Sequence, residues 1–391
     1  MILERVELTV GAVAHGGHCV ARIGEPPGRV VFVRHALPGE RVVAEISEEH
    51  PGYLRADAVS VLEASPDRVE PPCPYARPDA CGGCDLQHLA PPAQLEWKAA
   101  VVREQLARLA GLPDFPVRVE PLPGGPLGWR TRVRYTVDAA GRAGLLKHRS
   151  HEVVPVDRCR IAHTAIQELP VTGRAWPSAS TVDTVAPAAG PALVGPDGVF
   201  GGPIVERAVG REWTLPADAF WQVHPAAADT LAGAVLDMLE PRPGESAWDL
   251  YGGAGLFAAA LASKLGPAAP ITLVESAQPA VAAARNNLTD LTGLRVVQST
   301  VEVALRRRRL DGPVDLVVLD PPRTGAGAGV TRAVMAAGPR AVAYVACDPA
   351  AFARDVRTFR DGGWQLAALR AFDMFPMTHH VECVGLLVPS L

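Results

Sequence analysis

Residues 248–257 read WDLYGGAGLF, and this stretch decides the fold of the C-terminal part of the chain. An apolar segment reaches an acid, Asp249, then a glycine turn, and then a segment that can form a helix. Glycines at 252, 253 and 255 let the backbone approach a ligand at the N-terminus of that helix. The order of strand, glycine turn and helix is typical of an α/β sheet that binds a ligand at its edge.

The sequence around this turn keeps the same alternation from about residue 216 to the end of the chain. Strand-like runs such as ITLVE (271–275) and VVLD (317–320) alternate with alanine-rich helical segments. We therefore expect a Rossmann-like, mostly parallel, doubly wound sheet with right-handed crossovers over residues 216–391.

The preceding residues predict two further domains. Residues 1–62 contain short β-branched runs separated by glycine and proline, which predicts a small OB-like β-barrel. Residues 63–215 predict a central β-rich domain that begins with a cysteine cluster. Within it, residues 91–112 have the periodicity of an amphipathic helix, and residues 171–200, rich in Ala, Pro, Ser, Thr and Gly, predict a loop or connector.

Two acids at predicted strand ends outline a cofactor site. Glu275 ends the strand after the glycine turn, where a carboxylate can bond the ribose hydroxyls of an adenosine cofactor. That spacing fits either a dinucleotide or S-adenosylmethionine, although G-G-A-G builds no clear pyrophosphate cradle. Asp320 ends a strand in LDPPR (319–323), where two prolines fix an extended lip at the same edge.

The segment YVACDP (344–349) places Cys347 at the end of the next strand, on an Asp348–Pro349 turn that holds the thiol at the sheet edge. A nucleophilic role requires a lowered pKa or a nearby base, whereas a buried packing cysteine requires neither. Glu382 lies in the apolar run VECVGLL (381–387), where a carboxylate either pairs or works with a raised pKa.

Three of the seven cysteines fall within twelve residues, Cys73, Cys81 and Cys84, and Cys159 lies downstream in VDRCRI. In a cytosolic chain such clustering indicates a metal before a disulfide. Four thiolates suit zinc or an iron–sulfur cluster, and spacing alone does not separate the two.

Composition limits the remaining possibilities. The chain has 391 residues, a formal net charge of -4 and no apolar run long enough for a membrane span. Its first ten residues carry three charges and lack a signal region, so we expect a cytoplasmic protein without a membrane or an implied protein partner. Residues 118–160 nevertheless hold nine Lys and Arg against four acids, a local basic segment suited to nucleic acid.

Together, DLYGGAG (249–255), LDPPR, YVACDP and THHVE (378–382) resemble, in order and spacing, the RNA uracil-C5 methyltransferases that make 5-methyluridine. The resemblance spans nearly the whole chain, and ADAFWQVHP (217–225) is similar to the F-x-Q-x-N segment of that family. It implies methylation of C5 of a specific uridine in RNA with S-adenosylmethionine.

The resemblance also implies roles for individual residues. Cys347 would add to C6 of uracil, which makes C5 a nucleophile for the methyl group, and Glu382 would then remove the C5 proton. The positions that match cofactor contacts of the family are Gln222, Tyr251, Gly253, Glu275 and Asp320. Asp320 would also reach the uracil.

The two predicted N-terminal domains carry the same resemblance. Cys73, Cys81, Cys84 and Cys159 are similar to the 4Fe–4S site of the family, and residues 1–62 resemble a TRAM domain. Because those residues are not basic, phosphate contacts would fall to RTRVRY (130–135) and KHRSHE (147–152). The target uridine would be flipped out of a loop, and the combination of barrel and cluster favours 23S ribosomal RNA over transfer RNA.

Four positions depart from the family pattern. Seven residues, where the family usually has five, separate Cys73 from Cys81. Gly252 replaces a usual cysteine, Leu256 replaces an asparagine on the cofactor side, and His224 stands at the asparagine of F-x-Q-x-N. None removes the nucleophile, the base or the ribose-binding acid.

Two other readings use the same residues. A non-catalytic RNA-binding iron–sulfur protein would retain the methyltransferase shell but lack the nucleophile or the base, and both are present. An amino-group methyltransferase would pair its D-P-P motif with an aromatic residue, where this chain has Arg323.

Overall fold

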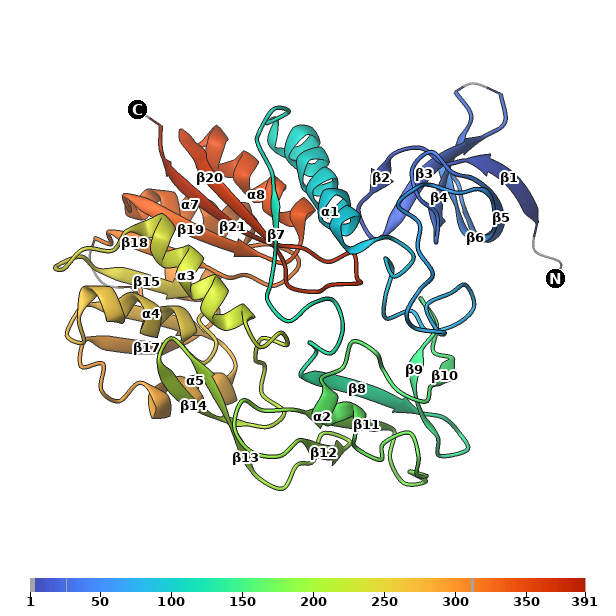
Figure 1. The fold of residues 1–391 in the computed structure, drawn as a ribbon. Coiled ribbons are helices and arrows are strands. Elements are labelled where there is room, and N and C mark those ends of the chain that lie inside the picture. The colour runs from blue at the N-terminus through green and yellow to red at the C-terminus, as the bar shows by residue number, and fades with distance from the viewer. Residues whose placement is uncertain (1–3, 26, 311–312, 391) are drawn as a thin grey trace.

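The computed structural model describes residues 4–25, 27–310 and 313–390, which form three neighbouring parts (Figure 1). The N-terminal sheet comprises β1 (Arg5–Thr9), β2 (Val13–Ala14), β3 (His18–Ile23), β4 (Arg29–Arg34), β5 (Arg41–His50) and β6 (Tyr53–Glu63). Its strand order is β1-β5-β6-β4-β3-β2. Alternate apolar side chains of these strands share one buried core, as the β-branched pattern predicted.

A five-stranded sheet in the order β10-β9-β8-β11-β12 forms the central part. Its elements are β8 (Arg132–Val137), β9 (Ala143–Leu146), β10 (Val153–Pro155), helix α2 (Thr164–Gln167), β11 (Thr181–Val185) and β12 (Leu193–Pro196). The prediction of a connector over 171–200 was wrong for β11 and β12. Buried Val182 and Val185 pair β11 with β8, and the surrounding Pro, Ala and Gly residues hid this short strand.

The C-terminal part is an eight-stranded sheet in the order β17-β16-β15-β18-β19-β21-β20-β7. Strands β15 to β19 run parallel, and β21 lies antiparallel between β19 and β20. The strands are β7 (Val119–Pro121), β15 (Ala247–Leu250), β16 (Ile271–Glu275), β17 (Leu294–Gln298), β18 (Leu316–Leu319), β19 (Ala341–Ala346), β20 (Trp364–Asp373) and β21 (Glu382–Pro389).

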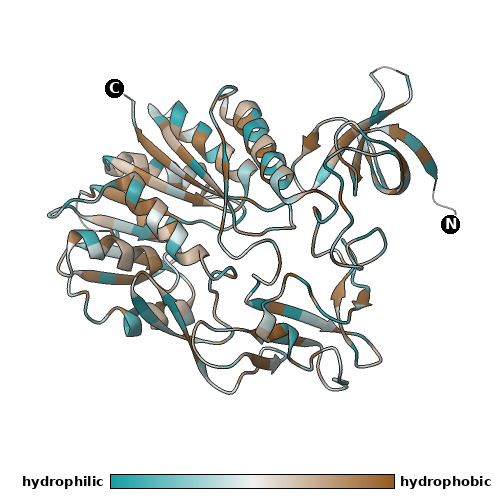
Figure 2. Ribbon diagram, in the orientation of Figure 1, coloured by the Kyte–Doolittle hydropathy of each residue, from teal (hydrophilic) through white to brown (hydrophobic). Residues whose placement is uncertain are grey.

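Helices cover both faces of this sheet, as a doubly wound fold requires. They are α3 (Ala227–Leu239), α4 (Leu256–Leu265), α5 (Gln278–Asn287), α6 (Val301–Arg306), α7 (Gly327–Ala337) and α8 (Pro349–Asp361). Leu316 and Val318 of β18 join the core under α3, α4 and α5, whereas Val317 and Leu319 join the core under α7 and α8. Strands β18 and β19 are correspondingly buried at every residue. Figure 2 shows how hydrophobic residues are distributed along the sheet.

Segments from the middle of the chain complete this C-terminal part. Helix α1 (Pro91–Gln105), which ends in a π-helical turn (Leu106–Ala110), packs against α8, and β7 pairs with β20. The hairpin of β13 (Pro203–Ala208) and β14 (Arg211–Pro216) packs on the face that carries α5. The domain boundaries at residues 62 and 215 stay predictions. Strand β7 and helix α1 lie before residue 215 in the sequence but pack with the C-terminal part. Among the described residues, no helix could span a membrane.

A buried ion pair fastens α1 to the segment that follows β20. The Lys98 ammonium is fully buried and lies 2.5 Å from a carboxylate oxygen of Asp373, and it also donates to the carbonyl of Phe375 at 3.1 Å. Burial lowers the pKa of Lys98, and Asp373 opposes that shift.

We expect Lys98→Met to lower the free energy of unfolding by about 3–5 kcal/mol, because Asp373 would be left buried without its partner. Arg108→Ala is the control, since its ion pair with Glu104 lies on the surface and is worth about 0–1 kcal/mol. Urea denaturation of both variants measures the difference. Equal midpoints would show that the buried pair contributes nothing to stability.

Candidate active site

The sheet order brings the chemistry-bearing residues to one edge. Connections from β15 go outward in one direction to β16 and β17, and the chain then returns to β18 on the other side of β15. Ligands bind at such a switch point, outside the carboxyl ends of the strands. The glycine turn follows β15, Asp320 follows β18 and Cys347 follows β19.

Strand β21 adds the carboxylate to this edge. Its antiparallel register with β19 pairs Ala346 with Cys383. The next position in that register therefore places Cys347 opposite Glu382, with both side chains on one face of the sheet. Two residues that lie far apart in the sequence thus meet at the end of the sheet.

Burial and like charges set the protonation of this pair. Glu382 is only 5% exposed, and burial together with nearby Asp320 raises its pKa well above the usual range, against the opposing effect of Arg323. Burial and the Glu382 carboxylate raise the pKa of the Cys347 thiol to about 11. Burial and nearby Asp249 raise the pKa of Asp320 to about 7.

The Asp348–Pro349 segment begins helix α8 directly after Cys347. Asp348 caps helix α8 by accepting a hydrogen bond from the backbone N–H of Ala351 at 2.7 Å, and Pro349 is the first helical residue. The thiol opens on a small cavity of about 140 Å³. The cavity is lined by His15, Arg323, Cys347, Asp348, Pro349, His379, His380 and Val381.

The glycine turn and Glu275 also come together. The backbone N–H of Gly253 donates to one oxygen of the Glu275 carboxylate at 3.1 Å. The N–H groups of Ser276 and Ala277 donate to the other oxygen at 2.6 and 2.7 Å. Tyr251 has a positive φ of 65° and donates from its hydroxyl to Glu302 at 3.4 Å.

Two residues at and before this turn have surroundings that the motif alone did not predict. A Cβ at Gly252 would lie 2.6 Å from Leu273, so the position that is cysteine in the resembling family has no room here for a side chain. Asp249, which the sequence reading did not place in the site, is fully buried and accepts from the N–H of Ala258 at 2.9 Å. Its other oxygen has no partner among the described residues, and burial raises its pKa to about 7.

The segment before α3 supplies the remaining predicted residues. Gln222 is partly buried in this segment. His224 is buried and stacked on Trp129, and its Nδ1 accepts from the N–H of Ala226 at 3.2 Å. Its Nε2 has no hydrogen-bond partner among the described residues.

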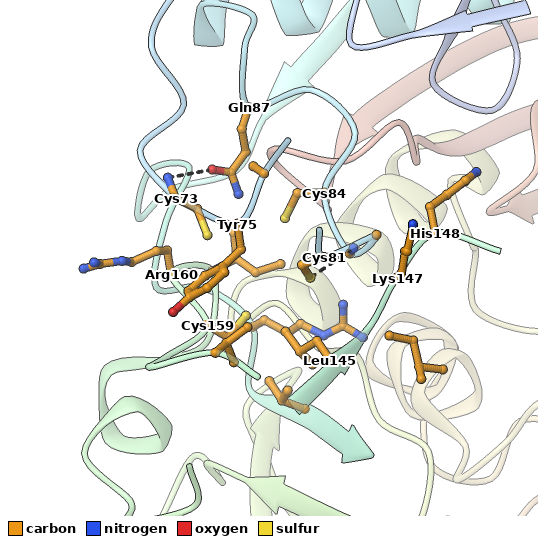
Figure 3. Close-up of a pocket in the computed structure, with 18 of the residues that line it drawn as sticks. Cys73, Tyr75, Cys81, Cys84, Gln87, Leu145, Lys147, His148, Cys159 and Arg160 are labelled. Atoms are coloured by element: carbon orange, nitrogen blue, oxygen red, sulfur yellow. Dashed lines mark hydrogen bonds between the residues drawn. The ribbon is translucent and has the colours of Figure 1, made fainter. Parts of the chain in front are cut away.

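The four cysteines of the predicted metal site line one cavity of about 470 Å³ between the residue 73–88 loop and the central sheet (Figure 3). Gly82 allows the close approach of the two segments, because a Cβ there would lie 2.5 Å from the backbone of His148. In the described part of the chain, however, no group of three or more His, Cys, Asp or Glu side chains is placed to hold a metal ion.

Basic side chains surround the same cavity. Those that line it are Arg130, Arg134, Lys147, Arg149, Arg158 and Arg160. They come from the segments RTRVRY, KHRSHE and VDRCRI, so the basic segment predicted from the sequence gathers in space around the cysteines. Burial raises the pKa of Cys81 to about 11 and also raises the pKa of Cys84 and Cys159.

Comparisons with known proteins agree with this arrangement. Residues 1–59 match the TRAM domain model, and residues 207–390 match the model described as tRNA (Uracil-5-)-methyltransferase. A Streptomyces avermitilis protein named "Uncharacterized RNA methyltransferase" is 49% identical, with 99% of each chain covered. A Streptomyces coelicolor protein named as an RNA methyltransferase is 48% identical, over 100% of this chain and 94% of the relative.

The fold has a solved counterpart. The Pyrococcus abyssi tRNA (uracil-54, C5)-methyltransferase, in complex with S-adenosyl-L-homocysteine, superposes with a TM-score of 0.70 over 97% of this chain and 99% of that one, at 22% identity. The family model and the two Streptomyces relatives, all described as methyltransferases, support an enzyme over the non-catalytic alternative. The chain belongs to the tRNA (uracil-5-)-methyltransferase family of RNA methyltransferases and carries an N-terminal TRAM domain.

Proposed function

We propose that this methyltransferase transfers a methyl group from S-adenosylmethionine to C5 of a uridine in RNA, which gives 5-methyluridine. The observation that supports this most directly is the register of β19 and β21, which places Cys347 opposite Glu382. A thiol and a buried carboxylate at one sheet edge suit a reaction that needs a nucleophile and then a base.

Cys347 makes the unreactive C5 carbon a nucleophile. When its thiolate adds to C6 of uracil, the ring becomes an enolate, and electron density moves to C5. S-adenosylmethionine supplies the methyl group that C5 accepts. Glu382 then removes the proton from C5. The electron pair of the C5–H bond forms the C5–C6 double bond, which breaks the bond between C6 and the Cys347 sulfur and restores the uracil ring. The raised pKa of Glu382 makes its carboxylate a stronger base.

The residues around the glycine turn fit the cofactor. Glu275 lies at the end of β16 with its carboxylate fixed beside the Gly253 backbone, where it could bond ribose hydroxyls. One oxygen of buried Asp249, beside this turn, has no hydrogen-bond partner among the described residues. We assign cofactor binding to Gln222, Tyr251, Gly253, Glu275 and Asp320.

RNA fits the basic rim of the larger cavity, which provides phosphate contacts. Since C6 of a stacked uracil is inaccessible to a thiol, the target would be flipped out of a loop. We propose ribosomal RNA as the substrate, ahead of transfer RNA, because of the TRAM domain and the cysteine set.

We further propose that Cys73, Cys81, Cys84 and Cys159 hold a 4Fe–4S cluster. Their shared cavity and their sulfur chemistry fit a cluster. The absence of a compact single-ion group in the described residues is compatible with a cluster, since four irons need more widely spaced thiolates than one ion. In the absence of metal, burial disfavours the thiolates, so binding would release protons.

Replacing the nucleophile tests the reaction. We expect Cys347→Ala to form no 5-methyluridine while it still binds S-adenosylmethionine, because C5 is not activated. Mass spectrometry of digested RNA and calorimetry of cofactor binding measure the two. Cys19→Ala, which removes a buried thiol of the N-terminal sheet, should keep activity. If Cys347→Ala still makes 5-methyluridine, the mechanism is wrong.

Replacing the base tests the second step. In Glu382→Gln, Cys347 should still add to C6 of uracil and C5 should still accept the methyl group, but the C5 proton would stay in place and the product would not be released. A protein–RNA adduct would then accumulate and migrate slowly on a denaturing gel. The adduct should be missing from the Glu382→Gln, Cys347→Ala double variant. Loss of turnover without any adduct would argue against Glu382 as the base.

Elemental analysis tests the cluster. Anaerobically purified protein should contain iron and acid-labile sulfide and absorb in the visible range. Cys159→Ser should lose both, whereas Cys347→Ala should keep them, since that thiol lies at the other cavity. Zinc in place of iron, or iron retained in Cys159→Ser, would contradict the assignment.

A further inference from the structure

The turn between β2 and β3 of the N-terminal sheet lies at the catalytic cavity. Nε2 of His15, in this turn, lies 3.2 Å from a carboxylate oxygen of Asp348. His15 lines the cavity of about 140 Å³ on which Cys347 opens. Its ring also lies edge-on to His379, with centroids 6.4 Å apart. A residue more than 300 positions upstream in the sequence therefore contacts the residue that directly follows the nucleophile.

Two glycines let the β2–β3 turn pack closely against the neighbouring loop. Gly16 and Gly17 both have positive φ, of 93° and 77°. A Cβ at Gly17 would lie 2.8 Å from the Cβ of Asp85, so the turn is in direct contact with that residue. Asp85 in turn accepts a hydrogen bond from Nδ1 of His379 at 2.6 Å. The turn thus touches, directly or through one residue, the segments that lead to both Cys347 and Glu382.

We propose that the β2–β3 turn is part of the active site, and that His15 is a positioning residue that holds the Cys347–Asp348 turn for addition to uracil. This inference rests on the proposed function. It assigns to the N-terminal sheet a role in the chemical step, beyond any contact with RNA.

Asp348 transmits the effect because both of its carboxylate oxygens are engaged. One accepts from the N–H of Ala351 at 2.7 Å as the cap of α8, and the other faces His15. With both oxygens held, the carboxylate cannot rotate, and the backbone of the preceding Cys347 is fixed with it. If His15 were removed, only the helix cap would remain. A displacement of about 1 Å at reacting atoms costs about 100-fold in rate.

The ionised state of Asp348 is consistent with its pairing with His15. Burial raises the pKa of Asp348, but the hydrogen bonds from His15 and Ala351 outweigh burial, and the pKa lies below its usual value. The group beside the nucleophile is therefore a carboxylate at neutral pH, and it needs a donor on its second oxygen. His15 supplies that donor across the boundary between two sheets.

The first experiment separates positioning from RNA binding. In steady-state assays with saturating cofactor, His15→Ala should lower kcat about 10- to 100-fold with little change in KM for RNA. His15→Gln, whose amide can replace the donor at Nε2, should recover most of the rate. In an Asp348→Asn background, His15→Ala should lose most of its effect, because the two residues act as one unit.

A histidine of the same sheet is the matched control. His50 pairs with Glu48 at 3.0 Å, and His50→Ala should leave kcat unchanged. A raised KM with unchanged kcat in His15→Ala would overturn the inference, because the turn would then only bind RNA. Equal kcat losses in His15→Ala and His50→Ala would also overturn it, since they would reflect a general loss of the sheet.

The second experiment tests whether close packing of the turn against Asp85 matters for the rate. It compares two glycines of similar backbone conformation. Gly17→Ala should lower kcat, because its Cβ would collide with Asp85, whereas Gly39→Ala should not. Gly39 has a φ of 84°, close to that of Gly17, but a Cβ there meets nothing within 4 Å. The two variants share the backbone strain and differ in the collision, so equal rates would show that this packing does not matter.

These outcomes are distinguishable from failure of the proposed function. A wild-type enzyme that forms no 5-methyluridine refutes the proposed function and the inference with it. A wild-type enzyme whose activity depends on Cys347, together with a His15→Ala variant of full rate, refutes only the role of the turn.

Discussion

The antiparallel pairing of β21 with β19 is the constraint on which the site depends. If β21 ran parallel to β19, its last residue would lie at this edge in place of its first. Because β21 runs antiparallel, Cys383 pairs with Ala346, the last residue of β19, and Glu382 therefore faces Cys347 one position further on. A slip of one residue would turn Glu382 to the opposite face of the sheet. The apolar run that follows Glu382 prevents such a slip, since Cys383 and Val384 are fully buried in the two cores on opposite faces.

The same packing buries several acids close together, which makes their charged forms unfavourable and shifts their pKa values. Burial raises the pKa of Asp249, Asp320 and Glu382 at this edge of the sheet. A neighbouring acid adds to the shift of each: Glu275 at Asp249, Asp249 at Asp320 and Asp320 at Glu382. The thiol of Cys347 shares this environment, and with its pKa raised to about 11 it keeps its proton at neutral pH in the free protein. Addition to uracil therefore requires that the thiol give up its proton to solvent at the cavity when substrate is bound. Arg323 lowers the pKa of both Cys347 and Glu382, and it is the positive charge on the cavity wall that opposes the acids.

Local patterns predicted most of what lies at the sheet edge. The glycine turn, Asp320 and Cys347 each follow an apolar strand, and the carboxyl ends of parallel strands share an edge, so their proximity follows from order alone. The contacts that the sequence did not predict join segments far apart in the chain. They include β7 on β20, the pair of Asp85 with His379, and that of His15 with Asp348. No period or spacing encodes such pairs, because they depend on how whole sheets pack. Strand β11 was missed for a different reason, since its five residues are too few to show a pattern among prolines and alanines.

The loop before β21 joins the cysteine cavity to Cys347 and Glu382, the proposed nucleophile and base. Cys84 lines that cavity, and the next residue, Asp85, holds His379. The N–H of Leu86 donates to the carbonyl of Met377 at 3.0 Å, and the buried side chain of Met377 packs with Trp129 beside Cys84. Whatever fixes Cys84 therefore also fixes the segment that leads to Glu382. The C-terminal sheet builds the proposed cofactor turn by itself, whereas residues of the two preceding parts contact the segments that carry Cys347 and Glu382. If these two residues act as proposed, the TRAM domain and the cysteine loop complete the geometry of the site as well as contacting RNA.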